Sequence, residues 1–404
     1  MGEETLGPIA ELLRAQGLTA EDLAAFMGQS GEPRDTEVVT VKEYVEQVSA
    51  GLSEGTLRGY NTHFQRFING VGPQCSCTCP ECVKEWDADG SCSCRCGKCN
   101  NALSWAAAGG RPMRAREFTR TELDPFVEIA QRIAAKRATR DNARRAKKGL
   151  SAKPAHGQGG REMCVTALKC LFGRAFDDEL IHRNPAEKLD KGGRSRSRRR
   201  ALSEDELELL LEEVVSGGDD PELDLLITWA ALELGARRGG LVSLAVGGLL
   251  TARQSISVLE KGRKAREQPA SVELLESLLA HSARRGGSRC VPGHEDFDPA
   301  APVLYYRDST PERPHPLGRR RFDTLHRRIQ RALPWANEMM YSGHAIRHTT
   351  GTIIERIAGT QVARVMLGHE RRTPTDIYTD STAAEVATAF SVMTGSPHPL
   401  ASAD

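Results

Sequence analysis

Residues 341–378 read YSGHAIRHTTGTIIERIAGTQVARVMLGHERRTPTDIY, and the spacing within this stretch decides how the rest of the chain is interpreted. His344 and Arg347 are three residues apart in an apolar-periodic segment, so a helix places both side chains on one face. A Leu-Gly pair then predicts the end of a helix, and His369 follows it directly. A Thr-Pro pair predicts the start of the next helix, with Tyr378 in its first turn.

The four side chains together indicate a chemistry that none of them indicates alone. A single Arg, His or Tyr is most often an ion-paired, structural or packing residue. An Arg fork with two imidazoles can hold the non-bridging oxygens of a phosphate. A Tyr becomes a nucleophile once its proton is removed. The stretch therefore predicts a site that acts on a phosphate ester.

The order H-x-x-R, L-G-H and then a Tyr nine residues later resembles the catalytic half of the tyrosine recombinase (phage integrase) family. The resemblance implies a further Arg after a buried helix and a Lys on a β-hairpin. LLITWAALELGARRGGLVSL matches the family's G-x-R box, and SISVLEKGRKARE has the pattern of two strands joined by a tight turn. The family's Lys falls on Lys261, with Lys264 as the alternative, and Gly240 replaces the family's usual acidic residue. The implied catalytic residues are Arg237, Lys261, His344, Arg347, His369 and Tyr378.

The resemblance also implies a reaction, in which Tyr378 attacks a duplex DNA phosphodiester and leaves a 3′-phosphotyrosine. Arg237 and Arg347 would stabilise the charge on the non-bridging oxygens. His344 would take the Tyr proton, because an unperturbed Tyr has a pKa near 10. Lys261 would protonate the leaving 5′-oxygen, and His369 would hold a phosphate oxygen. No cofactor or metal is expected in these steps.

The fold that the resemblance implies is mainly α-helical with a small β-sheet. A SAM-like helical core-binding domain would precede a mixed α+β catalytic domain. The expected divisions are an N-terminal helical extension (1–35), the core-binding domain (38–190), a basic linker (191–200), the catalytic domain (201–390) and a tail (391–404). Helical periodicity supports these divisions at 41–50, 53–68, 121–138 and 203–215, and a last helix is expected at 382–390.

A Cys-rich segment at 75–99 lies outside the family pattern and holds eight of the chain's 11 cysteines. The motif C-x-C-x-C-x-x-C occurs twice with a period of 17. Eight thiols suit two Cys₄ sites, since Zn²⁺ binds four thiolates tetrahedrally. Disulfides and an iron–sulfur cluster are the alternatives. We expect two structural zinc ions, bound by Cys75, Cys77, Cys79, Cys82, Cys92, Cys94, Cys96 and Cys99.

The composition is that of a globular protein with 39% hydrophobic and 27% charged residues, and no apolar run is long enough to cross a membrane. The formal net charge of +1 conceals a basic region at 111–200, with 24 Lys and Arg against 11 Asp and Glu. Clustered positive charge favours nucleic acid, because each neutralised phosphate releases counterions. The N-terminus lacks the pattern of a secretory signal, so we expect a cytoplasmic, nucleoid-associated protein.

The most specific interpretation is a site-specific integrase of a phage or mobile element. Its partners would be double-stranded DNA attachment sites and three further copies in a synaptic homotetramer, with an excision factor as a further partner. Two alternatives remain, of which the first uses nearly the same residues and the second leaves them without a purpose. A type IB topoisomerase would relax one strand, and a zinc-containing DNA-binding regulator would not cut DNA at all.

Overall fold

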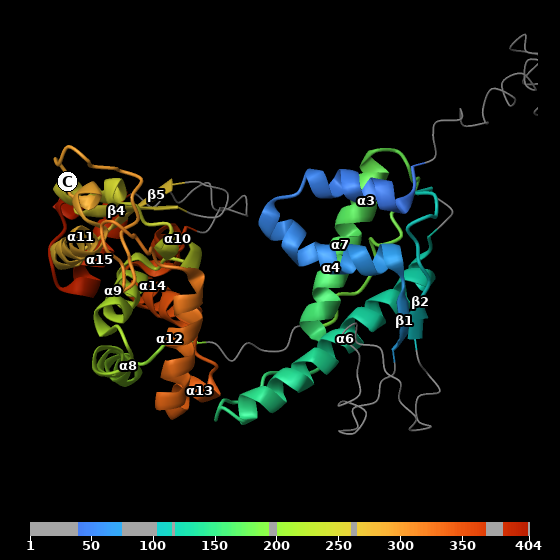
Figure 1. Cartoon of the computed structure of the whole chain (residues 1–404), viewed down its shortest axis with the longest axis horizontal. Helices are drawn as coiled ribbons and strands as arrows, with labels where there is room; N and C mark the ends of the chain where they lie inside the picture. The colour runs from blue at the N-terminus through green and yellow to red at the C-terminus, as the bar shows by residue number, and fades with distance from the viewer. Residues whose placement is uncertain are drawn as a thin grey trace, which may run out of the picture. The chain divides into compact units, whose positions relative to one another are not determined.

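The computed structural model describes residues 39–74, 103–114, 118–193, 200–259, 265–368 and 383–402 (Figure 1). The chain forms two compact units. One comprises Met1–Asp141 and Pro154–Arg194, and the other comprises Asn142–Lys153 and Ser195–Asp404. Most described residues are helical in both units, as the sequence predicts, and each unit contains one small antiparallel sheet.

The first unit is a set of helices with a short two-stranded ribbon. Its elements are α3 (Val41–Ala50), α4 (Glu54–Asn69), β1 (Val71–Gln74), β2 (Leu103–Trp105), α6 (Arg120–Ala146) and α7 (Gln158–Asp177), although the last residues of α6, 142–146, belong to the second unit. α3 starts with a capping box, in which the Thr40 side chain accepts from the Glu43 backbone N–H and the Glu43 side chain accepts from the Thr40 backbone N–H. α6 continues beyond the predicted 138, because Ala and Arg residues that favour helix extend its pattern.

Aromatic rings from distant parts of the chain meet in the core of the first unit. Phe67 of α4 stacks on Trp105 of β2 with ring centroids 5.2 Å apart, and it contacts Phe126 of α6 edge-on at 5.4 Å. The Trp105 Nε1–H donates to the Phe67 carbonyl oxygen at 3.2 Å, so the indole is buried without an unsatisfied donor. This contact places the β1–β2 ribbon against α4.

The ribbon brackets the Cys-rich segment. Gln74, the last residue of β1, pairs with Leu103, the first residue of β2. The chain therefore leaves and re-enters the first unit at neighbouring points. The eight cysteines themselves lie outside the described residues.

The second unit is formed by helices around a three-stranded sheet. Its elements are α8 (Glu204–Ser216), α9 (Pro221–Leu234), α10 (Arg238–Val242), β3 (Leu249–Leu250), β4 (Ser255–Leu259), β5 (Ala265–Pro269), α11 (Val272–Gly286), α12 (Arg319–Ala332), α13 (Pro334–Glu338), α14 (Gly343–Met366) and α15 (Ala383–Thr394). The predicted capped helix is confirmed as α8, with Ser203 and Glu206 forming a capping box. The predicted final helix is confirmed as α15, which extends four residues beyond 390.

The predicted hairpin is confirmed by antiparallel pairing of β4 with β5. Its pairs run from Ser255 opposite Pro269 to Leu259 opposite Ala265. Ile256 and Val258 alternate along β4 and are fully buried, which fixes the register. The tip between Leu259 and Ala265 carries Lys261 and Lys264, and both lie outside the described residues. No helix in the described ranges is long and apolar enough to span a bilayer.

Candidate active site

Arg347 joins two of the sequence motifs through backbone carbonyl groups. Its side chain extends from α14 and is only 3% exposed. Nη1 donates to the carbonyl oxygen of Gly235, at the end of α9, and Nη2 donates to that of Leu367, at the end of α14. The G-x-R box and the L-G box therefore meet at one guanidinium, which is fixed in place by burial and by these bonds.

Two glycines make room for this junction. Gly235 caps α9 in the left-handed region with φ of 53°, where a side chain would be strained. A Cβ on Gly235 would lie 2.9 Å from Leu367 Cδ2, and one on Gly351 would lie 2.8 Å from Leu367 Cδ1. Thr350 Oγ1 donates to the Leu232 carbonyl oxygen at 2.6 Å and ties α14 to α9 nearby. The Leu367 side chain therefore occupies the space that a side chain at position 235 or 351 would need.

A pocket of about 360 Å³ opens beside this junction. Three predicted catalytic residues line it, namely Arg237, His344 and Arg347. Arg237 is the N-cap residue of α10, and His344 lies in the first turn of α14. Both are exposed, whereas Arg347 is buried. His344 and Arg347 both extend from α14 and line this pocket.

The other predicted site residues lie outside the described residues. Lys261 is at the tip of the β4–β5 hairpin, and His369 and Tyr378 fall between Gly368 and Ala383. The eight cysteines of 75–99 lie outside as well. Within the described ranges, no group of three or more His, Cys, Asp or Glu side chains is arranged to hold a metal ion.

The structure explains why glycine replaces an acidic residue three positions after Arg237. A Cβ on Gly240 would lie 2.8 Å from Val258 Cγ1 and 3.3 Å from the Leu259 carbonyl oxygen. The first turn of α10 thus packs directly on β4, and no carboxylate side chain fits there. Close backbone packing, which only glycine permits, positions the Arg237 turn.

Asp323 and His326 also line the pocket and were not identified from the sequence, because α12 carries no family motif. Asp323 of α12 pairs with Arg238 at 3.0 Å across the pocket rim. His326, also of α12, lines the wall, and burial lowers its pKa to about 4. Ser342 precedes α14 and also lines the pocket. The strongly amphipathic sequence RRRFDTLHRRIQRA was the only available signal.

Tyr341 is an unsuitable nucleophile despite lining the same pocket. Its side chain is 1% exposed, and burial raises the pKa of its phenol. The ring packs edge-on against His326 and Trp335 at centroid distances of 5.5 and 6.1 Å. Tyr341 therefore forms part of the hydrophobic wall.

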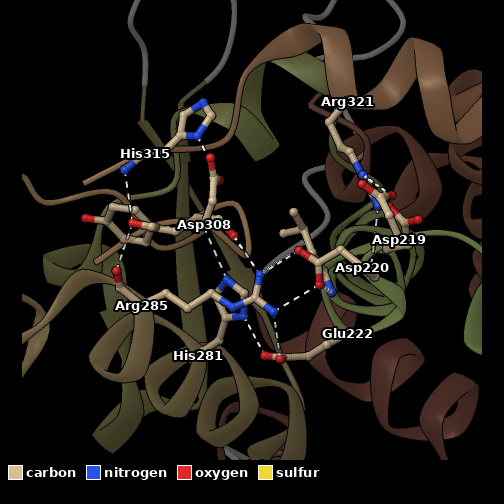
Figure 2. A network of polar contacts seen from close by, with 12 residues as sticks. Asp219, Asp220, Glu222, His281, Arg285, Asp308, His315 and Arg321 are labelled. Carbon is tan, nitrogen blue, oxygen red and sulfur yellow. Dashed lines mark hydrogen bonds and ion pairs between the residues drawn. The ribbon is translucent and has the colours of Figure 1, made fainter. Parts of the chain in front are cut away.

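A network of charged side chains, some of them buried, joins α9, α11 and α12 (Figure 2). Asp220, the N-cap of α9, binds the Arg285 guanidinium of α11 at 2.6 and 2.9 Å. Arg321 of α12 binds Asp219 and Asp224 at 2.7 and 2.8 Å. α9 ends at the Gly235 turn, and α12 forms the pocket wall. The network therefore ties α9 to α11 and to α12.

The charges in this network shift each other's ionisation. Burial opposes ionisation of Asp220, but the hydrogen bonds from Arg285 and from the Leu223 N–H outweigh it and lower its pKa. Burial lowers the pKa of His281, against the opposing pull of its contact with Glu222. The His281 Nε2 accepts from the Tyr305 N–H at 3.2 Å, so its proton is on Nδ1, 2.7 Å from Glu222 Oε1. His281 is thus a neutral bridge in the network.

Comparisons with known proteins give a family match and likenesses to solved structures. Residues 200–385 match the model of the phage integrase family. Among solved structures, the Tn1549 transposon integrase (residues 82–397) in complex with circular intermediate DNA is 16% identical, with a TM-score of 0.50 over 87% of this chain and 98% of that chain. A lambda integrase (75–356) dimer bound to a COC′ core site is 14% identical, with a TM-score of 0.46 over 85% of this chain and 98% of that chain.

No curated protein sequence matches the chain significantly. The likeness to the Tn1549 transposon integrase shows a similar fold, and the family model covers the residues of the candidate site. The match lies within the second unit and includes all six predicted catalytic positions, of which Arg237, His344 and Arg347 line the pocket. Residues 200–385 are identified as a phage integrase family domain, which covers 186 of the 404 residues.

Proposed function

We propose that this protein is a site-specific recombinase, which cuts and rejoins duplex DNA through a 3′-phosphotyrosine on Tyr378. The observation that carries the proposal is the pocket shared by Arg237, His344 and Arg347. The pocket offers two guanidinium groups and an imidazole to one small anionic group. A phosphodiester has the charge and the oxygen geometry that such groups bind.

In the proposed cleavage step, the Tyr378 hydroxyl attacks phosphorus and its proton passes to His344. The P–O bond to the 5′-oxygen breaks, and this oxygen takes a proton from Lys261. Arg237 and Arg347 stabilise the additional negative charge on the non-bridging oxygens, together with His369. Attack by the 5′-hydroxyl of another strand reverses these steps, so rejoining needs no nucleotide cofactor.

Arg347 supports this role through its fixed position. Its guanidinium is held by two carbonyl oxygens before any substrate binds. A preorganised cation loses little freedom when negative charge develops beside it. Exchange between two duplexes cuts four strands, and each chain has one proposed nucleophile. We therefore propose a homotetramer that acts on attachment sites of a phage or mobile element, with an excision factor setting direction.

For the Cys-rich segment we propose two structural zinc ions, bound by the eight cysteines of 75–99. The pairing of Gln74 with Leu103 holds the two described residues that flank this segment next to each other. The segment has only Val83 and Trp86 as large apolar residues, so burial contributes little to its folding. Thiolate–zinc bonds would supply the missing stabilisation.

Covalent trapping tests the proposal. A pool of nicked duplexes with random sequence is incubated with the protein, and protein-linked DNA is recovered after denaturation. The wild-type protein should select a site and form an adduct that protease treatment releases. Tyr378→Phe should bind the selected site and form no adduct, whereas Tyr341→Phe should retain adduct formation. An adduct on the Tyr378→Phe protein would place the nucleophile elsewhere.

A further inference from the structure

Ser342 lines the pocket, and its hydroxyl group makes no hydrogen bond within the described residues. It occupies the N-cap position of α14 with extended backbone, φ −156° and ψ 164°, yet its side chain makes no capping hydrogen bond. Within the described part of the chain, its hydroxyl oxygen is buried and has no hydrogen-bond partner. An N-cap serine normally bonds to a backbone N–H of the first turn, and a buried hydroxyl without a partner is unfavourable.

The position of Ser342 points to a ligand for this hydroxyl. Ser342 lines the same pocket as Arg237, His344 and Arg347, and it immediately precedes the helix that carries the last two. The serine side chain has a single rotatable χ1 torsion that positions the oxygen, so rotation among its staggered positions redirects the hydroxyl group without any backbone movement. The pocket opening is the direction in which a polar group of a ligand can arrive.

The turn around Ser342 is held rigidly. A Cβ on Gly343 would lie 3.4 Å from His326 Nε2, so glycine lets the imidazole approach the backbone closely. His326 also packs edge-on against Tyr341 at 5.5 Å. The residues on both sides of Ser342 are therefore held by one ring. A donor on a rigid turn is preorganised for a substrate oxygen.

We infer that Ser342 is a further substrate-contacting residue, whose hydroxyl donates to a non-bridging oxygen of the phosphodiester bound beside Arg237 and Arg347. This inference rests on the proposed recombinase function. A hydroxyl that donates to a charged oxygen accelerates cleavage by about 10- to 100-fold when its bond strengthens in the transition state. Loss of the hydroxyl should leave DNA binding nearly unchanged, because most of the affinity comes from phosphates elsewhere.

The test measures single-turnover adduct formation by the full-length wild-type, Ser342→Ala and Ser342→Thr proteins on a site selected by covalent trapping. Three substrates are compared, namely the ordinary phosphodiester and the two phosphorothioate stereoisomers at the cleaved position. We expect Ser342→Ala to be about 10- to 100-fold slower on the phosphodiester. Ser342→Thr, which keeps a hydroxyl, should recover most of the rate.

The stereoisomers separate contact from structural support. Sulfur accepts hydrogen bonds poorly, so the isomer with sulfur at the contact position should slow the wild type and have little further effect on Ser342→Ala. Equal effects on both proteins would mean that the serine acts through structure and would overturn the inference. A Ser342→Ala rate equal to that of wild type, or a lower melting temperature, would also overturn it. Failure of the wild type to form any adduct would instead refute the recombinase function on which the inference rests.

Discussion

Replacing Asp220 by Asn isolates one buried charge in the network that joins α9, α11 and α12. Asp220 and Arg285 have side-chain exposures of 4% and 9%, and the guanidinium binds both carboxylate oxygens. The Asp220 side chain also accepts from the Leu223 N–H at 3.3 Å as the N-cap of α9. Asn caps helices as well as Asp does, so this substitution removes the charge and keeps the cap.

The expected loss follows from what Arg285 retains. Removing one partner of a buried pair costs about 3–5 kcal/mol. Arg285 keeps Glu222 at 2.9 Å and the Tyr305 carbonyl oxygen at 3.2 Å, so the lower figure of about 3 kcal/mol applies. For a unit of this size, this corresponds to a fall in Tm of about 6–12 °C. Asp220→Ala should cost about 1 kcal/mol more, because it also removes the cap.

Thermal melts of the full-length protein at neutral pH provide the assay. Asp298→Asn is the matched control, because Asp298 pairs with Arg289 at a similar distance of 2.8 Å with both side chains 40% exposed. The control should leave Tm unchanged within error. An Asp220→Asn protein that melts with wild type would refute the account of the network. Adduct formation well below Tm should be unaffected, since Asp220 does not line the pocket.

The pH dependence gives the same prediction an independent check. The folded-state pKa of Asp220 is lowered, so the unfolded chain binds the proton more readily. The stabilisation is then present above the ordinary Asp pKa and is lost as pH falls through the lowered folded-state pKa. The difference between wild type and Asp220→Asn should persist from pH 7 to pH 5 and shrink below about pH 4.

Three further predictions test other parts of the molecule. Gly240→Asp supplies the family's usual acid, but its side chain would collide with Val258. We therefore expect a loss of stability of about 1–3 kcal/mol in thermal melts and no adduct in covalent trapping. A variant that melts with wild type and forms the adduct would contradict the packing. Lys261→Ala should be rescued by a 5′-bridging phosphorothiolate leaving group, and rescue of Lys264→Ala instead would move the acid to Lys264. Paired Cys→Ser changes within 75–82 or 92–99 should reduce zinc content by elemental analysis, and wild-type protein with less than about one zinc per chain would exclude the two-site proposal.

The sequence predicts those parts of the fold that local patterns determine. Alternation along 256–258 predicts a strand, and the Ser203–Glu206 capping box predicts the start of α8. The end of α6 is missed, because a basic, Ala-containing segment resembles both a loop and a helix end. The β1–β2 ribbon is missed as well, since β1 contains Gly and Pro and pairs across a long separation in sequence.

The candidate site shows the same division. Arg237, His344 and Arg347 could be assigned from motif spacing because each lies within or next to a recognisable box. Asp323 and His326 could not, because α12 reaches the pocket only through tertiary packing. Ser342 was adjacent to the motif and still gave no signal. A serine at a helix start predicts a cap, and only the structure shows that this one makes no capping bond.

The buried side chain of Arg347 links three of the sequence motifs in space. One guanidinium must reach the carbonyl oxygens of Gly235 and Leu367 at the same time, so the ends of α9 and α14 have to meet at a fixed separation. That meeting requires a residue without a side chain at both 235 and 351, because Leu367 fills the space between them. G-x-R, H-x-x-R-x-x-x-G and L-G are thus three parts of one packing arrangement. A Lys at position 347 would make at most one of the two carbonyl contacts in the same geometry, so the bond to either Gly235 or Leu367 would be lost.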